Sequence, residues 1–419
     1  MDRSEISVDE EQDQGSDGTV GPTDSLLFDG ESNPLSPSVD GGDTAPTTPP
    51  RRGPSRRTKL IITLTAPVVG LLLVELALRA IVLTDVLADA AWAADLRNPI
   101  KYTRPRSPSG SDYWKLFYSQ QAPEDRWLPQ RHPILGWIRE DFDPATYQHE
   151  QEARLAGRRP VLLFGSSFVR CLPPVAECHE DLLERSPLAA DLALINFSVT
   201  GYGLGQVGIL TALAVDRFRA LDPIVVVAIH VDEDLDRLSL SFRHGPKPRF
   251  SASEEGGLAI EVPDQLDVDR YLEAHPIEIR SYAWNHLLFG TGLVPNPPRE
   301  RLRGTLAHGK TIVPLVPRAL AQIQSVLGGL DYFILVVGSP ATIKEGFKGD
   351  WRHSSLMRSI ETLNLPYVSA HEMLREAVEV ERRPISDFIN PANGHPNAEG
   401  VVLIQRALER GLMGDFDSP

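Results

Sequence analysis

A buried-strand pattern that ends on a serine turn constrains this chain more than any other feature. Residues 160–169 read Pro-Val-Leu-Leu-Phe-Gly-Ser-Ser-Phe-Val, so an apolar run leads directly into Gly165 and two serines. Such a run, bounded by glycine and serine, is typical of a strand buried in a parallel sheet. In open α/β sheets ligands bind outside the carboxyl ends of the strands, which is where Ser166 and Ser167 fall. Ser167 is therefore either a nucleophile or a turn residue.

The sequence after this strand alternates between strand and helix patterns. Further strands are predicted at 192–199, 223–230, 331–337 and 366–369, and helices near 176–186, 205–220, 316–327, 352–363 and 397–412. Alternation at these lengths predicts an α/β fold, with a central parallel sheet and helices on both faces. Residues 240–312 interrupt the alternation. A hairpin pattern over 247–262 within them predicts an insertion at the sheet edge that forms a lid or a pocket wall.

The first 58 residues are acidic and poor in large apolar side chains. Residues 1–50 hold twelve acidic residues against one arginine, a net charge of −11, so the rest of the chain carries only −4 of the total −15. A segment of this composition buries too little surface to offset its ordering entropy, so we expect disorder over 1–58. The folded part is close to neutral, and no nucleic-acid partner is expected.

The apolar run from Leu60 to Leu83 predicts a transmembrane helix over 59–84. Nineteen residues lie between Lys59 and Arg79, about enough to cross a hydrocarbon core of roughly 30 Å. Glu75 and Arg79 stand four residues apart and can pair on one helix face, with Arg79 extending outward.

A basic cluster at residues 51–59 precedes this run and predicts its orientation, with the tail cytoplasmic and the C-terminal part periplasmic or extracellular. One alternative is a signal peptide cleaved near Ala90. The long leader and the long apolar core argue against it. The other is a buried amphipathic helix, but the run has no polar stripe. Residues 85–157 then form a juxtamembrane segment, in which Trp127 and the run 132–137 predict packing on the domain.

The chain holds two cysteines, Cys171 and Cys178, too few for a disulfide framework or a structural zinc site. In an oxidising compartment they either pair, closing the loop after Ser167, or remain as two buried thiols.

Catalysis by a serine requires a base, a group that orients the base, and donors for an oxyanion. His395 stands on a glycine loop, Asn393-Gly-His-Pro-Asn-Ala-Glu-Gly400, just before the last predicted helix. The turn after the second strand contains Gly201, whose backbone N–H can face an oxyanion. An acidic turn, His230-Val-Asp-Glu-Asp234, follows the third strand.

The chain resembles the SGNH/GDSL esterase family over about residues 158–413. The motifs that carry the resemblance are, in order, Gly165-Ser-Ser167, Gly201, the acidic turn and His395-Pro-Asn-Ala-Glu-Gly400. The runs Glu75-Leu-Ala-Leu-Arg79, 132–137 and Lys247-Pro-Arg-Phe250 are similar to its membrane-anchored bacterial branch. The resemblance implies a flavodoxin-like three-layer sandwich, the SGNH hydrolase fold. It also implies no metal and no organic cofactor, and the hydrolysis or transfer of acyl esters on lipids and glycans.

The same resemblance assigns residue roles. Ser167 is the nucleophile and His395 the base, and the N–H groups of Ser167 and Gly201 belong to the oxyanion hole. The third oxyanion position, where the family usually has an asparagine donor, is Glu233. An ionised carboxylate there accepts hydrogen bonds and cannot donate them.

The position three residues before the histidine also departs from the family, which usually has an acid there. It is Ala392. His395 would then be oriented by Asp387, by Asn393 or by a backbone carbonyl. If a backbone carbonyl orients it, the catalytic group is a serine–histidine dyad.

Two further patterns compete with this interpretation. Gly203-Leu-Gly-Gln-Val-Gly208 matches the glycine pattern of dinucleotide sites, follows a strand and opens a helix, but it leaves Ser167 and His395 unexplained. His230, Asp232 and Asp234 alternate along the chain. They either ligate a metal or form a solvated acidic turn, and the second is favoured.

The sequence therefore predicts a single-pass membrane protein whose domain, residues 158–415, is a serine esterase or O-acyl transferase. Its expected substrates are acylated envelope glycans or lipids. The alternative, motivated by Glu233 and Ala392, is a catalytically impaired relative that binds glycan or scaffolds an export assembly.

Overall fold

The fold is that of a computed structural model of the 419-residue chain. It describes residues 55–84, 87, 90–103, 110–121, 126, 130–139, 154–231, 233–291, 309–338 and 351–417. The predictions made for the tail before residue 55, for Trp127 and for Asp232 lie outside these ranges. The chain divides into two units, residues 1–60 and 61–419, and the elements that position the site belong to the second.

Five parallel strands form the central sheet, in the order β4-β3-β5-β8-β9. The strands are β3 Arg159–Phe164, β4 Leu192–Asn196, β5 Ile224–His230, β8 Asp331–Val337 and β9 Tyr367–Ser369. Numbered along the chain this order is 2-1-3-4-5, the doubly wound order of flavodoxin-like folds. The predicted parallel sheet is confirmed, and each strand lies close to its expected range.

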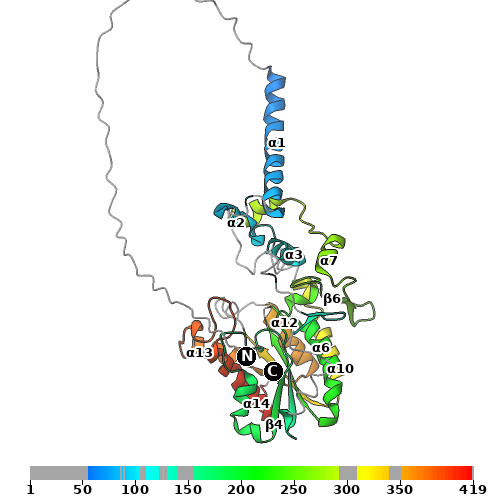
Figure 1. The fold of residues 1–419 in the computed structure, drawn as a ribbon, viewed down its shortest axis with the longest axis vertical. Coiled ribbons are helices and arrows are strands. Elements are labelled where there is room, and N and C mark those ends of the chain that lie inside the picture. The colour runs from blue at the N-terminus through cyan, green and yellow to red at the C-terminus, as the bar shows by residue number, and fades with distance from the viewer. Residues whose placement is uncertain are drawn as a thin grey trace, which may run out of the picture. The chain divides into compact units, whose positions relative to one another are not determined.

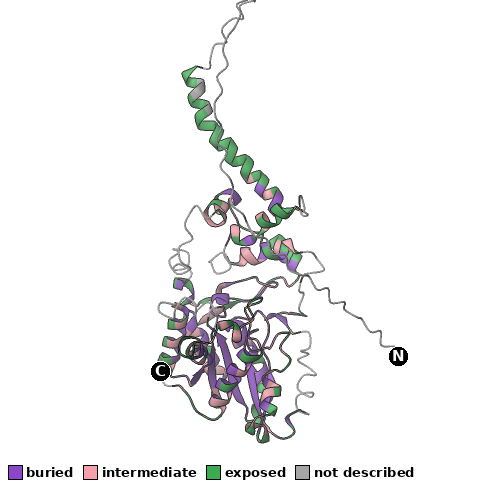
Figure 2. Cartoon of the chain, turned by 90° about the vertical axis from the view of Figure 1, so that its left-hand side faces the viewer, coloured by how far each residue is buried: buried purple, intermediate pink, exposed green. Residues whose placement is uncertain are grey.

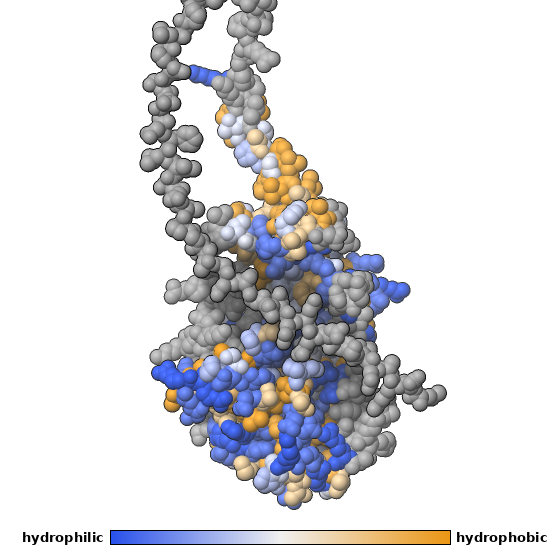
Figure 3. Space-filling model, turned by 60° about the vertical axis from the view of Figure 1, so that its left-hand side comes forward, coloured by the Kyte–Doolittle hydropathy of each residue, from blue (hydrophilic) through white to orange (hydrophobic). Residues whose placement is uncertain are grey.

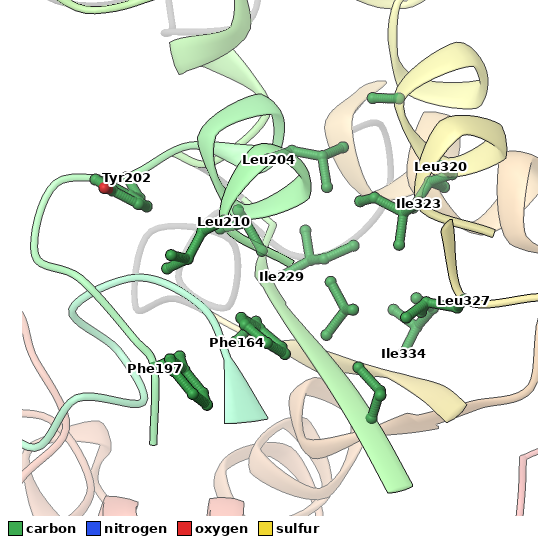
Figure 4. Packing of buried hydrophobic residues seen from close by; sticks show 14 of the residues in the cluster. Phe164, Phe197, Tyr202, Leu204, Leu210, Ile229, Leu320, Ile323, Leu327 and Ile334 are labelled. Atoms are coloured by element: carbon green, nitrogen blue, oxygen red, sulfur yellow. The ribbon is translucent and has the colours of Figure 1, made fainter. Parts of the chain in front are cut away.

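Alternate residues of each strand face opposite sides of the sheet, and each side has its own hydrophobic core. Leu162 and Phe164 of β3 belong to the core that is covered by α6 Leu204–Phe218, α10 Val316–Val326 and α12 Trp351–Leu363. Figure 4 shows Phe164, Ile229 and Ile334 of the sheet facing leucines and isoleucines of α6 and α10.

The opposite face carries the second core. Val161 and Leu163 pack there with α5 His179–Glu184, α13 Ala370–Glu379 and α14 Ala398–Leu412. The result is a three-layer α/β/α arrangement in which the strands are buried on both sides (Figures 1 and 2). A continuous apolar strand is the sequence that such double burial requires.

Short helices fill several of the connections. They are η3 Pro187–Ala190, η4 Arg219–Leu221, η5 Asp236–Ser239 and η7 Ile385–Asp387. In the insertion after β5, the expected hairpin is present as β6 Arg249–Ala252 and β7 Leu258–Glu261, which pair antiparallel. It is followed by α7 Val268–Ala274, α8 Tyr282–Asn285 and the π-helical turn η6 His286–Gly290.

The N-terminal part of the second unit begins in α1 Arg56–Leu83. Within α1, Thr63–Leu83 is long and apolar enough to cross a membrane, with a mean hydropathy of 2.2. Most of this helix is exposed (Figure 2). It is followed by α2 Ala91–Arg97, η1 Pro99–Lys101, α3 Gly110–Gln120, and the short antiparallel strands β1 Gln130–His132 and β2 Gly136–Ile138.

Lys247 fixes the start of the insertion. Its side chain is buried, and its ammonium donates to the backbone oxygens of Arg237, Leu240 and Pro248 at 2.9, 2.7 and 2.7 Å. Three N–H donors are thus matched by three acceptors, which is how a buried ammonium is tolerated.

We expect Lys247→Met to loosen the insertion, because it takes the ammonium donor from the Leu240 and Pro248 carbonyl oxygens. The Arg237 carbonyl keeps the Leu240 N–H, at 3.3 Å. One unsatisfied buried acceptor costs roughly 1–3 kcal/mol, so with two of them the local unfolding free energy should fall by about 2 kcal/mol or more. Hydrogen exchange on the full-length protein should show faster exchange over residues 249–261 and little change in β3. Lys310→Met, at an exposed position, is the matched control. Equal exchange in the two variants contradicts the role given to Lys247.

Candidate active site

Ser167 and His395 meet at the carboxyl edge of the sheet. Ser167 follows the end of β3, and His395 stands in the loop that precedes α14. His395 Nε2 lies 2.9 Å from Ser167 Oγ, a hydrogen-bonding distance. Ser167 is only 4% exposed. The two residues expected to act as nucleophile and base are therefore in contact, although 228 positions separate them along the chain.

The turn that carries Ser167 is closely packed. A Cβ at Gly165 would lie 2.5 Å from Val169 Cγ2 and 3.1 Å from Ala228 Cβ, so only glycine fits at that position. Asn196, at the end of β4, ties this turn to the next one. Its side-chain N–H donates to the Val169 carbonyl at 2.7 Å, and its oxygen accepts the Ser198 N–H at 3.0 Å.

The loop that carries His395 is a tight, internally bonded turn. The Asn390 N–H donates to the His395 carbonyl, and the Gly394 N–H donates to the Asn390 carbonyl, both at 2.8 Å. Gly394 has a φ of +74°, a conformation that glycine adopts without strain. Asn397 then caps α14 by accepting the Gly400 N–H, so the imidazole is carried at a well-defined helix start.

The second ring nitrogen of His395, Nδ1, is buried and has no hydrogen-bond partner among the residues that the structure describes. Both side chains expected to orient the ring bond elsewhere. The Asp387 carboxylate accepts from Arg383 Nε at 3.3 Å, and the Asn393 oxygen accepts the backbone N–H of His395 at 3.0 Å. Ala392 is exposed. The contact that holds the imidazole is therefore the one to Ser167.

One aromatic ring packs against the histidine. The Phe168 ring lies 5.2 Å from the His395 ring and stacks 3.5 Å from the His230 ring, between centroids. Burial lowers the pKa of His395, and the Glu233 carboxylate partly opposes this effect. Neutral imidazole, the form that acts as a base, is thus favoured to lower pH than in a free histidine.

Glu233 is held by arginines. Its carboxylate accepts from Arg237 and lies 3.5 Å from Arg243 Nη2. Its side chain is an acceptor here, so it supplies no donor to an oxyanion.

Asp234 departs from the expectation of a solvated acidic turn, because it is 1% exposed. Its carboxylate accepts the His230 N–H at 2.9 Å and Arg237 Nη1 at 3.1 Å, and it also bonds the Ser166 hydroxyl. Burial raises the pKa of Asp234 to about 7, against the opposing effect of Arg237. Sequence reasoning missed this role because an acidic run normally indicates a solvated surface.

Gly201 lies in the turn after β4 with a φ of +84°. A Cβ there would come within 2.6 Å of His244 Cδ2 and 3.4 Å of Trp137 Cζ2. The indole N–H of Trp137 donates to the neighbouring Thr200 carbonyl at 3.1 Å. The juxtamembrane run 132–137 thus contacts the turn that holds Gly201.

The glycines of the dinucleotide-like pattern are used for packing. A Cβ at Gly203 would lie 2.8 Å from the Asp234 carbonyl oxygen, and one at Gly208 would lie 3.1 Å from Ile323 Cγ1. Gly205 is covered by the Phe250 ring. These contacts give the three glycines a packing role, which does not depend on a bound dinucleotide.

Cys171 and Cys178 form a disulfide that closes the loop after Ser167. The described residues also contain one group of potential metal ligands, His353, His371 and Glu372, whose ligand atoms lie within 4.8 Å of one another. The Glu372 carboxylate already accepts from Arg375 Nε at 2.7 Å. The group shares no residue with the Ser167 site.

Neither a protein-family model nor a curated protein matches the sequence. Among solved structures, a lipase/acylhydrolase from Enterococcus faecalis is similar, with a TM-score of 0.35 and 12% identity over 62% of this chain and 98% of that one. An acetyl xylan esterase from Geobacillus stearothermophilus gives 0.33 and 14% over 62% and 97%. A GDSL-like lipase from Parabacteroides merdae gives 0.32 and 12% over 61% and 95%. At these values the likeness assigns no activity, which has to come from the geometry of the site.

The lowered pKa of His395 predicts an acid limb below the ordinary histidine value of 6.5. Labelling of the serine by a fluorophosphonate should fall only when the pH drops through this lowered pKa. Glu233→Gln removes the charge that raises the pKa, so the limb should move to still lower pH. Glu255→Gln, at an exposed turn position, should leave it in place. An upward shift in Glu233→Gln contradicts the electrostatic argument.

Ala392→Asp tests the missing support of His395. If the new carboxylate accepts from Nδ1, it holds the imidazole in the reactive tautomer and stabilises its protonated form. We expect the rate of serine labelling at neutral pH to rise by about tenfold or more. Ala392→Asn is the matched control, because it is similar in shape and carries no charge. A rate that does not change, or that rises equally in both variants, contradicts this expectation.

Proposed function

We propose that residues 158–415 form a serine ester hydrolase or O-acyl transferase of the SGNH type, anchored to a membrane by α1. The observation that carries the proposal is the 2.9 Å contact between His395 Nε2 and Ser167 Oγ at the carboxyl edge of the sheet. Nucleophilic catalysis by serine begins from such a contact. The motif resemblance to SGNH esterases over residues 158–413 supports the same assignment.

In the proposed reaction, the Ser167 hydroxyl donates its proton to His395 Nε2 as its oxygen attacks an ester carbonyl. The backbone N–H groups of Ser167 and Gly201 face the oxyanion of the tetrahedral intermediate. Protonated His395 then returns the proton to the departing alcohol, which leaves an acyl group on Ser167. Water resolves this acyl-enzyme in a hydrolase, and the hydroxyl of an acceptor sugar resolves it in a transferase.

Two features make this a slow enzyme. Glu233 is an acceptor where the family usually has a donor, and the loss of one oxyanion donor typically costs about 10²–10³ in rate. His395 has no described partner at Nδ1, so the proposed machinery is a dyad and lacks the third group of a triad.

The proposed orientation places the tail in the cytoplasm and the catalytic domain outside. The basic cluster before α1 supports it. So does the disulfide between Cys171 and Cys178, since disulfides persist in oxidising compartments. An external site at a membrane would meet acylated envelope glycans and lipids, which we propose as the substrate class.

A second candidate is a catalytically impaired protein that binds glycan or scaffolds an export assembly through the same site. The observations that favour it are the unpartnered Nδ1 of His395 and the arginine-paired Glu233. It differs from the first in one measurable property, the reactivity of Ser167.

The full-length protein should react with a fluorophosphonate probe and hydrolyse a short acyl ester, and Ser167→Ala should abolish both. Ser251→Ala, at an exposed position of β6, is the matched control and should retain both. No labelling of the intact protein between about pH 6 and 9, a window that spans the titration of an ordinary histidine, would sink the enzyme proposal and favour the second candidate.

A further inference from the structure

The C-terminal third of α1 is packed against protein, in contrast to the rest of the helix. Leu78 and Val82 are 6% and 2% exposed, whereas Leu72, two turns earlier, is 57% exposed. The buried face contacts Tyr102 after η1, Leu116 of α3 and residues 279–283 of the insertion. The segments that directly follow α1 and a distant part of the chain, residues 279–283, therefore pack against the same end of α1.

A carboxylate inside the apolar stretch organises this contact. Glu75 accepts the Ser281 hydroxyl at 2.9 Å and the backbone N–H groups of Tyr282 and Ala283 at 3.1 and 2.8 Å. These N–H groups belong to the first turn of α8, so Glu75 caps that helix from another part of the chain.

Arg79 completes the arrangement. It donates from Nε to Glu75 at 2.6 Å and from Nη2 to the Arg280 carbonyl at 2.9 Å, and it lies 5.2 Å from the centre of the Tyr282 ring. An ionised pair in a membrane segment is costly unless its hydrogen bonds are satisfied. Here the insertion satisfies it, so the pair is more than an i,i+4 contact on one helix face.

The last carbonyls of α1 are bonded as well. Arg97, at the end of α2, donates from Nε to the Ile81 carbonyl at 2.9 Å. Gln120, at the end of α3, donates from its side chain to the Val82 carbonyl at 3.3 Å. Helix ends leave such carbonyls unsatisfied, and here side chains from the surrounding segments take the place of water.

These contacts place α8 at the depth of the bilayer surface. About twenty residues cross a hydrocarbon core of roughly 30 Å, and twenty residues counted from Leu60 end at Arg79. The segment that binds Glu75 and Arg79 must then lie where the acyl chains meet the headgroups. Amphipathic helices bind at that boundary, with their apolar face about 5–10 Å deep.

The same elements expose large apolar side chains. Trp284 on α8 and Trp92 on α2 are 55% and 56% exposed, and Ile100 on η1 and Leu287 on η6 are 41% and 38% exposed. Tryptophan is enriched at membrane interfaces, where its ring is apolar and its N–H stays wet. Figure 3 shows apolar surface continuing from α1 onto the parts that surround its end.

We propose that α2, η1, α8 and η6 form an interfacial collar, residues 91–101 and 281–290, that lies in the leaflet next to the catalytic domain. Its partner is the lipid bilayer itself, which takes up Trp92, Ile100, Trp284 and Leu287. The proposal rests on the proposed membrane anchoring of α1. It adds that the insertion, which leaves the sheet beside the Ser167 site, reaches the bilayer directly and so links the site to that surface.

The collar is tested in the full-length protein, reconstituted in lipid nanodiscs. Because both native cysteines are held in the disulfide, Trp284→Cys can be labelled selectively with an environment-sensitive fluorophore. A spin label near the headgroup end of the lipid chains should quench this fluorophore by about twofold or more. Val380→Cys, at a position 69% exposed after α13, is the water-facing control and should show no quenching. If the fluorophore at position 284 shows the same water-exposed emission as the one at position 380, and is not quenched by the spin label, the collar is overturned.

A third label separates failure of the collar from failure of the anchor. Leu72→Cys lies on the exposed face of α1, so its fluorophore should be quenched by lipid in any anchored protein. Quenching at 72 without quenching at 284 overturns the collar alone, and no quenching at 72 overturns the proposed anchoring and the collar together.

Glu75→Ala tests what holds α8 in place. It removes the acceptor of three donors from residues 281–283, so hydrogen exchange of this segment should rise by about tenfold or more, while lipid quenching at position 72 is kept. Unchanged exchange over 281–283 overturns the role of Glu75 in holding the collar.

Discussion

The buried carboxylate of Asp234 is the interaction on which the arrangement of the site depends. One oxygen accepts the N–H of His230 at the end of β5, the other accepts from Arg237, and the Ser166 hydroxyl is a third partner. The Asp234 carbonyl also accepts the Leu204 N–H, which starts α6. A buried polar group that loses a hydrogen-bond partner typically costs about 1–3 kcal/mol. The turn that presents Ser167 is thus held by the neighbouring strand and helix as well as by its own residues.

The supports are unequal on the two sides of the proposed dyad. The serine turn is held by side-chain hydrogen bonds from Asn196 and Asp234. The imidazole is held by its contact with Ser167, by packing on Phe168 and by its own loop. If Ser167 donates to Nε2, the ring proton must sit on Nδ1, where no described acceptor receives it. An unsatisfied buried donor costs roughly 1–3 kcal/mol, and this cost opposes the tautomer that catalysis needs. The lowered pKa of His395 acts in the same direction, towards a weaker base.

The sequence predicted what depends on local pattern and missed what depends on contacts between distant segments. Apolar runs located all five strands, and motif order brought Ser167 and His395 together. Helix α13 was missed because it begins directly after β9, with Ser369 serving both as the last strand residue and as the helix cap. The burial of Asp234 could not be anticipated, since its partners come from the turns after β3 and β5. The glycines of residues 203–208 matched a ligand motif, but they serve close packing with Arg237, Phe250 and Ile323.

The insertion contacts both the proposed catalytic site and the proposed membrane helix. Its first residues are tied to the site, because Lys247 donates to the carbonyl of Arg237, the residue that pairs with Asp234. Its later residues bind Glu75 and Arg79 of α1. One segment thus contacts both the acidic turn beside Ser167 and the helix proposed to cross the membrane. A catalytic head on a long flexible tether would not need these bonds. In the proposed membrane-anchored enzyme, these bonds would set the distance between Ser167 and the bilayer, and they favour the proposal that its esters are presented at the membrane surface.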